Sequence, residues 1–200
     1  KIMKKIIRNL GYVVVFAWTF SACSNENKQN DAAENKPDLN ESAEEVNDKK
    51  FDNPSEADAK FVTEVADINY AEIKLGELAQ AKGMTNDVKE LGKMMVTEHT
   101  KANSDLMALA QKKSITFPEG PSNDAISTYN SMNDLKGDDF DKKYCDKMVS
   151  GHKDAIDKFE KAAADCQDAD IKTWASSMLP ALRMHLDHSQ KCEEMVKKMN

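Results

Sequence analysis

The chain has 200 residues, enough for one domain with a hydrophobic core and some additional chain. It carries 35 acidic and 28 basic side chains, which gives a formal net charge of -7. An acidic protein repels the phosphates of nucleic acids and the anionic headgroups of lipids, so neither is expected as a partner. The sequence contains no Cys-x-x-Cys motif, phosphate-binding loop or nucleophile elbow, and therefore does not support a hydrolase or a transferase.

Residues 1–22 have the parts of an export signal. A cationic start at Met3–Arg8 precedes the apolar run Leu10–Phe20, which is too short to span a bilayer as a permanent helix. The following Ser21, Ala22 and Cys23 resemble a bacterial lipoprotein signal, although Phe20 departs from the small aliphatic residue usual in that family. The resemblance implies that Cys23 carries acyl chains, including palmitate, and anchors the protein in the cell envelope. Ser24 follows the lipidated position in place of the aspartate that retains enterobacterial lipoproteins in the inner membrane, so we expect the outer membrane. The alternative interpretation of residues 1–23 is an ordinary secretory signal with an incidental cysteine.

The segment from Ser24 to about Asp52 is rich in Asn, Glu, Lys, Asp and Ala and has few large apolar residues. Such a segment cannot bury enough apolar surface to offset the entropy lost on ordering. We therefore expect a lipidated, disordered tether at 23–52 and a folded domain at 53–200.

The folded part begins with a predicted helix that has Asn53 as N-cap, Pro54 at its first position and Gly83 at its end in the left-handed conformation. A second helix is capped by Thr85 or Asn86. Each helix places its apolar residues on one face at spacings of three and four. The two stripes are Phe61, Val65, Ile68, Glu72, Leu75 and Ala79, and Val88, Gly92, Met95, His99, Ala102, Leu106 and Leu109.

Residues 114–137 contain Pro118, Gly120 and Pro121 and read as a long connection with a weak helical patch at 124–135. A third helix opens at Gly137 with Asp138 as its cap, and a fourth starts at Asp168. Their stripes are Asp141, Cys145, Met148, His152, Ala155, Phe159, Ala162 and Cys166, and Ile171, Ala175, Met178, Leu182, His185, Ser189, Cys192 and Val196.

Four long helices with single-sided stripes must bury those stripes against one another, which predicts an all-α four-helix bundle. Short links make the first pair and the last pair antiparallel, and the long connection allows the second and third helices to run parallel. If the last two helices fold back near Gln167, His152 faces His185 and Cys145 faces Cys192.

Each stripe carries one polar residue near the middle of its helix, so the four predicted helices bring these residues to one level. A metal site is one interpretation, and imidazole ligands favour zinc, copper or nickel over magnesium or calcium. A metal-free polar layer, in which the glutamate hydrogen-bonds the histidines, is the alternative. The candidate metal ligands are Glu72, His99, His152, His185 and His188.

Cys145 and Cys192 are the candidates for a disulfide between the third and fourth helices, in keeping with an oxidising envelope compartment. The alternative is that both are small reduced residues of the core.

Several segments resemble a family of exported bacterial proteins, domain of unknown function 4142, which is assigned to the ferritin-like helical bundles. They are EIKLGELAQA at Glu72–Ala81, MVTEHTK at Met95–Lys101, FDKKYCDK at Phe140–Lys147 with Gly151 and His152, and LPALRMHLDH at Leu179–His188. The resemblance implies a ferritin-like fold and leaves the activity open.

Ferritin-like di-iron sites use Glu-x-x-His pairs, but here Val96 and Leu182 stand three residues before His99 and His185. The sequence therefore does not support oxygen-rich di-iron chemistry, although iron stays among the candidate metals. The leading hypothesis is an envelope lipoprotein that binds a metal ion in a non-catalytic or stress-related role. A metal-free interaction module on a tether comes second, and a metal-dependent oxidase comes third.

Overall fold

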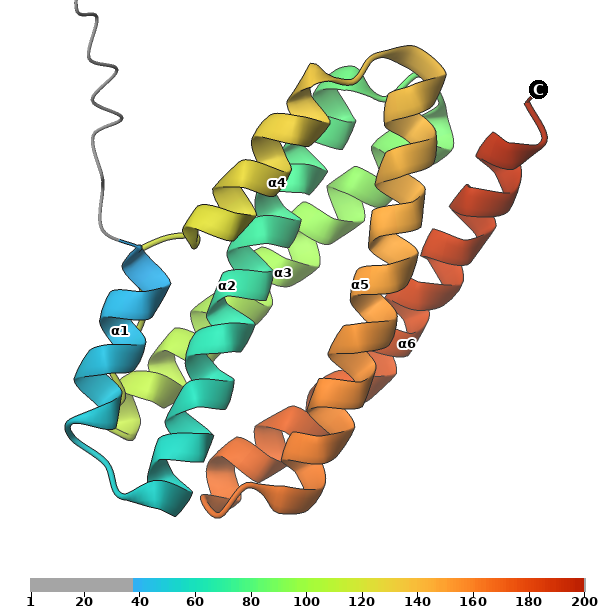
Figure 1. The fold of residues 1–200 in the computed structure, drawn as a ribbon. Coiled ribbons are helices and arrows are strands. Elements are labelled where there is room, and N and C mark those ends of the chain that lie inside the picture. The colour runs from blue at the N-terminus through green and yellow to red at the C-terminus, as the bar shows by residue number, and fades with distance from the viewer. Residues whose placement is uncertain (1–37, 200) are drawn as a thin grey trace, which may run out of the picture. The chain divides into compact units, whose positions relative to one another are not determined.

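The computed structural model describes residues 38–199, in which six α-helices and no strands are found (Figure 1). The predicted signal, Cys23 and the first part of the predicted tether lie outside the described residues. No described helix combines the length and the apolar composition needed to cross a membrane. The helices are α1 (Leu39–Asp48), α2 (Asn53–Lys82), α3 (Asn86–Lys112), α4 (Asn123–Asp134), α5 (Gly137–Asp165) and α6 (Ala169–Lys197). The all-α class is thus confirmed.

The four long helices pack most extensively as the pairs α2 with α3 and α5 with α6. The Lys112 ammonium at the end of α3 lies 2.8 Å from Asp170 at the start of α6, and the Met84 N–H, before α3, donates to Asp141 near the start of α5 at 3.0 Å. The starts of α3 and α5 are therefore at the same end of the domain, so these two helices run parallel as predicted. The connection returns along α2 and contains α4, whose N-cap Ser122 is held by Asp67.

Two glycines allow α2 and α3 to approach closely. A Cβ atom on Gly76 would lie 2.7 Å from the Gly92 carbonyl oxygen, and one on Gly92 would lie 2.7 Å from the Gly76 carbonyl oxygen. Any side chain at either position would therefore push the two backbones apart.

Helix α1 lies inside the segment expected to be a disordered tether, so that expectation is wrong over its length. The Asn47 side chain is buried and exchanges two hydrogen bonds with the backbone of Thr116, at 3.0 and 2.8 Å, and Asn40 donates to the Thr63 carbonyl. Amide hydrogen bonds rather than a large apolar face hold this helix against the domain, which is why composition did not reveal it.

Helix boundaries correct three further expectations. Helix α2 has Asp52 as its N-cap, one residue before Asn53, and Lys136 rather than Asp138 precedes α5. Gly83 ends α2 with a φ of -51°, so it is not left-handed. Glycine is needed there because a Cβ atom would lie 2.7 Å from Val88 Cγ1. Thr85, one of the two predicted caps of its helix, is confirmed, because its side chain accepts a backbone N–H group of α3. Asp168, the predicted start of the fourth helix, is the N-cap of α6 and accepts two backbone N–H groups.

The interior consists of two apolar clusters separated by a polar layer. One cluster contains Phe61, Leu106, Phe159 and Leu182, and the other contains Leu75, Met95, Tyr144 and Cys192. On each long helix one or two buried polar residues lie between the parts that belong to the two clusters. These residues are Asn69 and Glu72 on α2, His99 and Asn103 on α3, His152 on α5, and His185 and Ser189 on α6.

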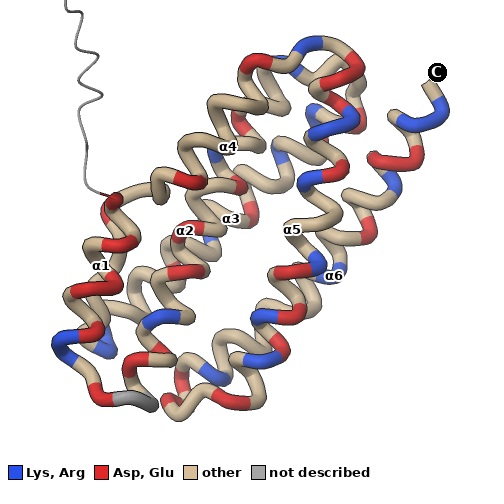
Figure 2. The backbone as a smooth tube through the Cα atoms, viewed as in Figure 1, with Lys and Arg blue, Asp and Glu red and all other residues tan. Residues whose placement is uncertain are grey.

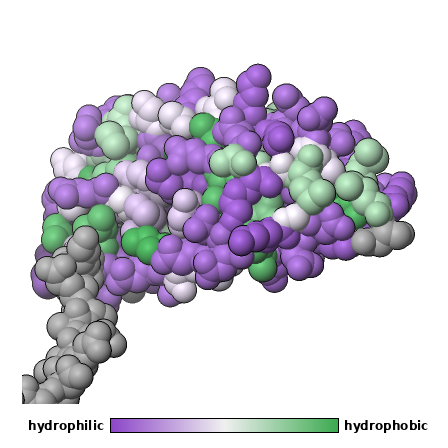
Figure 3. Space-filling model, turned by 90° about the horizontal axis from the view of Figure 1, so that it is seen from above, coloured by the Kyte–Doolittle hydropathy of each residue, from purple (hydrophilic) through white to green (hydrophobic). Residues whose placement is uncertain are grey.

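The surface is charged and mixed in sign. Acidic and basic residues alternate along the long helices in Figure 2, and the face shown in Figure 3 is mostly hydrophilic with scattered hydrophobic residues. Lys158 on α5 pairs with Glu64 on α2, and Arg183 on α6 pairs with Glu160 on α5 at 2.7 Å. Exposed pairs of this kind contribute little stability, so the buried layer is the informative polar feature.

Candidate metal centre

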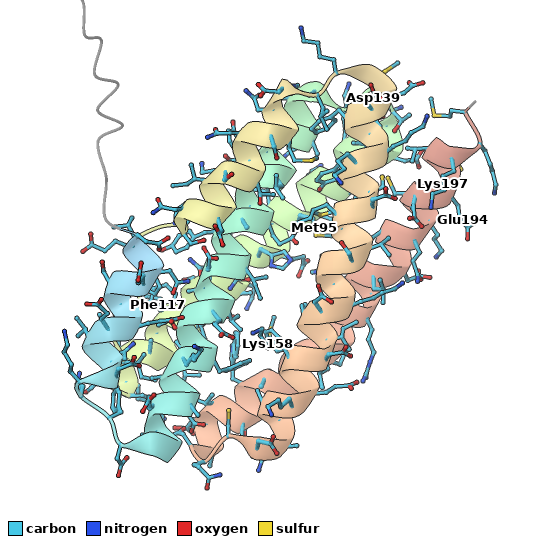
Figure 4. The ribbon with its side chains drawn as sticks, viewed as in Figure 1. Met95, Phe117, Asp139, Lys158, Glu194 and Lys197 are labelled. Atoms are coloured by element: carbon cyan, nitrogen blue, oxygen red, sulfur yellow. The ribbon has the colours of Figure 1, made fainter. Side chains whose placement is uncertain are left out.

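Three of the five predicted ligands come together. His99 on α3, His152 on α5 and His185 on α6 each offer one ring nitrogen, and these nitrogens all lie within 4.8 Å of one another. The ring centroids are 5.3 to 5.7 Å apart, and the side chains are only 4, 1 and 3% exposed. Met95, labelled in Figure 4, is fully buried one turn before His99. We call these three histidines the histidine cluster.

Hydrogen bonds fix the orientation of two of the rings. His99 Nδ1 lies 2.9 Å from the side-chain oxygen of Asn69, and His152 Nδ1 lies 2.9 Å from the carbonyl oxygen of Met148. Both partners are acceptors, so each Nδ1 carries the proton and each Nε2 keeps its lone pair. Neither Nε2 has a hydrogen-bond partner among the described residues, and neither ring nitrogen of His185 has one.

The three imidazoles are neutral near pH 7. Burial lowers the pKa of His99 well below 6.5, and the charges that His152 and His185 would carry lower it further. Burial also lowers the pKa of His152, and burial together with His152 and His188 lowers that of His185 to about 4. The cluster therefore presents lone pairs that a metal ion can use without displacing protons.

Glu72 belongs to the polar layer but not to the histidine cluster, which corrects the prediction that it is an equal ligand. Its Oε1 faces the backbone of Gly151, where a Cβ atom would lie 3.4 Å away, and its Oε2 has no partner. No hydrogen bond joins Glu72 to a histidine among the described residues. Asn69, one turn earlier on α2, bonds His99 instead. Burial raises the Glu72 pKa to about 8, although the Lys147 charge lowers it.

The structure also corrects the prediction that His188 is a metal ligand. It is exposed and lies outside the histidine cluster, on a surface groove between α3 and α6. Three residues beyond His185, its side chain is rotated away from the interior. The sequence did not identify Asn69, whose only signal is its place beside the stripe residue Ile68.

A cavity of about 20 Å³ adjoins the cluster, lined by His99, His185 and Asn69 together with apolar side chains such as Phe159 and Leu182. This volume is about that needed for one water molecule. A larger substrate has no room beside the histidines.

The predicted cysteine pair also lies in the interior. Cys145, Cys166 and Cys192 are buried free thiols. The Cys145 thiol contacts that of Cys192, and this hydrogen bond, with burial, raises the Cys145 pKa far above its usual value. Cys145 thus faces Cys192, and His152 faces His185, as the predicted register requires. The disulfide itself stays a prediction.

The fold and the site define an all-helical protein with a buried cluster of neutral histidines. The family model described as domain of unknown function DUF4142 matches residues 30–192, and the chain belongs to this family. The resemblance of the sequence to domain of unknown function 4142 is therefore confirmed. Neither the curated proteins nor the solved structures include a match to this chain.

Proposed function

We propose that this protein binds one transition-metal ion through His99, His152 and His185. The observation that carries the proposal is that three imidazole nitrogens without partners, one from each of three helices, converge in the interior. A buried polar atom without a partner destabilises the fold by about 1–3 kcal/mol, so an arrangement that leaves three together favours a ligand.

The residues present fit a metal ion. Two imidazole nitrogens on one tetrahedral zinc ion are about 3.3 Å apart, so nitrogens already within 4.8 Å need only small side-chain rotations. Asn69 and the Met148 carbonyl already hold the outer ring nitrogens of His99 and His152, as outer-shell acceptors do in known metal sites.

The donor set indicates which ions fit. Three neutral nitrogens without a carboxylate favour zinc, copper or nickel, and iron is less well matched. A zinc ion held by three histidines can activate a water molecule in its fourth position. The small adjoining cavity supports a binding role rather than turnover of a substrate.

The setting of the site forms part of the proposal. We infer a ferritin-like four-helix bundle made by α2, α3, α5 and α6, because each of these helices contributes to the polar layer. Acylation of Cys23 would anchor this bundle in the outer membrane of a bacterial envelope. The support for the anchor is the sequence pattern at residues 3–23.

Metal analysis of full-length protein purified without a polyhistidine tag tests the proposal. We expect about one metal ion per chain in the wild type, and its loss in H99A, H152A and H185A. The matched control is H188A, which removes an exposed histidine on the same helix as His185 and should keep the metal.

A metal-free polar layer is the second candidate, favoured by the hydrogen bonds from His99 to Asn69 and from His152 to Met148. It predicts no bound metal after equilibration with zinc, copper or nickel, and lower stability in all three cluster variants. Equal metal content in wild type and H152A would overturn the first proposal.

A further inference from the structure

A second chemical feature lies two helical turns from the histidine cluster. Cys145 is seven residues before His152 on α5, and Cys192 is seven residues after His185 on α6. Seven residues of α-helix rise about 10.5 Å, so the thiol pair is a separate site in the other half of the interior. The two thiols come from different helices and contact each other.

The two buried thiols differ in their surroundings. Cys145 is fully buried, and Cys192, although only 4% exposed, lines a surface groove of about 360 Å³ between α3 and α6. The groove is lined by Asp87, Glu90, Leu91 and Met94 on α3 and by His188, Lys191, Cys192 and Met195 on α6. A disulfide-bearing molecule that enters this groove would therefore meet Cys192 before Cys145.

His188 is suited to assist Cys192. It stands four residues before Cys192 on α6, which places the two side chains on the same face about 5–6 Å apart at Cβ, and both line the groove. Lys191, also in the groove, pairs with Asp187 at 2.6 Å.

We propose that Cys145 and Cys192 are a dithiol that is oxidised to an interhelical disulfide by an external disulfide, through the groove. His188 takes the Cys192 proton, and the Cys192 thiolate attacks one sulfur of the external disulfide, releasing a thiolate and forming a mixed disulfide. Cys145 then attacks Cys192 Sγ and expels the second thiolate, which takes the Cys145 proton, while His188 passes the Cys192 proton to the first released thiolate. Two protein thiols are oxidised and one external disulfide is reduced to two thiols.

The disulfide closes between α5 and α6, which are joined at their other end by the short turn near Gln167. The disulfide would link α5 and α6 at the end opposite this turn, with His152 and His185 between the disulfide and the turn. The inference does not depend on metal binding, because its chemistry uses only the thiol pair and the groove.

The test incubates reduced full-length protein with glutathione disulfide and follows the products by mass spectrometry after trypsin digestion. We expect the tryptic peptides YCDK (residues 144–147) and CEEMVK (residues 192–197) joined with the loss of two hydrogens. C166S, which removes the other buried thiol of the described domain, is the matched control and should give the same product.

Single cysteine variants separate the two roles. C145S should accumulate a glutathione adduct on Cys192, and C192S should give no adduct on Cys145, because that thiol has no route to the groove. H188A should slow the first step roughly tenfold or more, with added imidazole restoring the rate.

Failure to link Cys145 with Cys192, or modification of Cys145 in C192S, would overturn the proposal. A normal oxidation rate in H188A would remove His188 from it. The metal content of the same samples reports separately on the histidine cluster, so the two proposals can fail independently.

Discussion

Glu72 supplies the sharpest test of the polar layer, through the dependence of stability on pH. The residue is 6% exposed, its Oε2 has no hydrogen-bond partner among the described residues, and burial raises its pKa from 4.5 to about 8. The folded protein therefore binds this proton more tightly than the unfolded chain. The contribution of Glu72 to stability is fully present below pH 4.5 and is lost progressively as the pH rises towards 8.

The magnitude follows from the shift. Each pKa unit corresponds to about 1.4 kcal/mol, and pH 7 lies 2.5 units above the unfolded value of 4.5. At pH 7 the titration of Glu72 therefore lowers the free energy of unfolding by about 3 kcal/mol relative to pH 4 or below. The isosteric E72Q has no titrating group, so its advantage over the wild type should grow from near zero to about 3 kcal/mol over this range.

The assay is urea unfolding of metal-free protein at pH 4 to 8, comparing wild type with E72Q. The histidines act in the opposite direction, because their lowered pKa values make the fold less stable as the pH falls below 6.5, but they are common to both proteins and cancel in the difference. E77Q changes an exposed carboxylate of α2 and is the control. A difference between wild type and E72Q that stays constant with pH would refute the reasoning.

Three further substitutions test the packing. In G92A, a Cβ atom 2.7 Å from the Gly76 carbonyl should lower the free energy of unfolding by about 1–3 kcal/mol, measured by urea titration, despite the better helix propensity of alanine. In G151A the added Cβ meets only ordinary contact at 3.4 Å, so the same titration should show no loss and up to about 1 kcal/mol of gain. N47A removes both hydrogen bonds to Thr116 and should speed hydrogen exchange in α1 while α5 stays protected; equal exchange in both proteins would contradict this role.

The sequence predicted the long helices and the level of the polar layer because periodic apolar residues define both. A stripe with spacings of three and four fixes which side of a helix is buried, and a short turn near Gln167 then fixes which residues of α5 and α6 meet. The contacts of Cys145 with Cys192 and of His152 with His185 follow from these two facts alone.

The same periodicity could not locate the hydrogen-bond partners. Asn69 lies beside the stripe and bonds His99, while Glu72, a full member of the stripe, is rotated towards Gly151. Side-chain rotamers decide between these outcomes, and sequence spacing does not report them. The docking of α1 was missed for a related reason, because Asn47 and Asn40 bind backbone groups that no hydrophobic pattern marks.

The arrangement of the partnerless atoms favours a ligand over a purely structural layer. A polar layer that only sets the register of the helices is most stable when every member is hydrogen-bonded. Here the outer nitrogens of His99 and His152 are satisfied by Asn69 and Met148, while the inner nitrogens of both rings and the whole His185 ring are left without partners. One partnerless nitrogen of each ring therefore lies where the three rings meet. A centre that binds an ion needs this pattern, because the ion supplies the missing partner to all three rings at once.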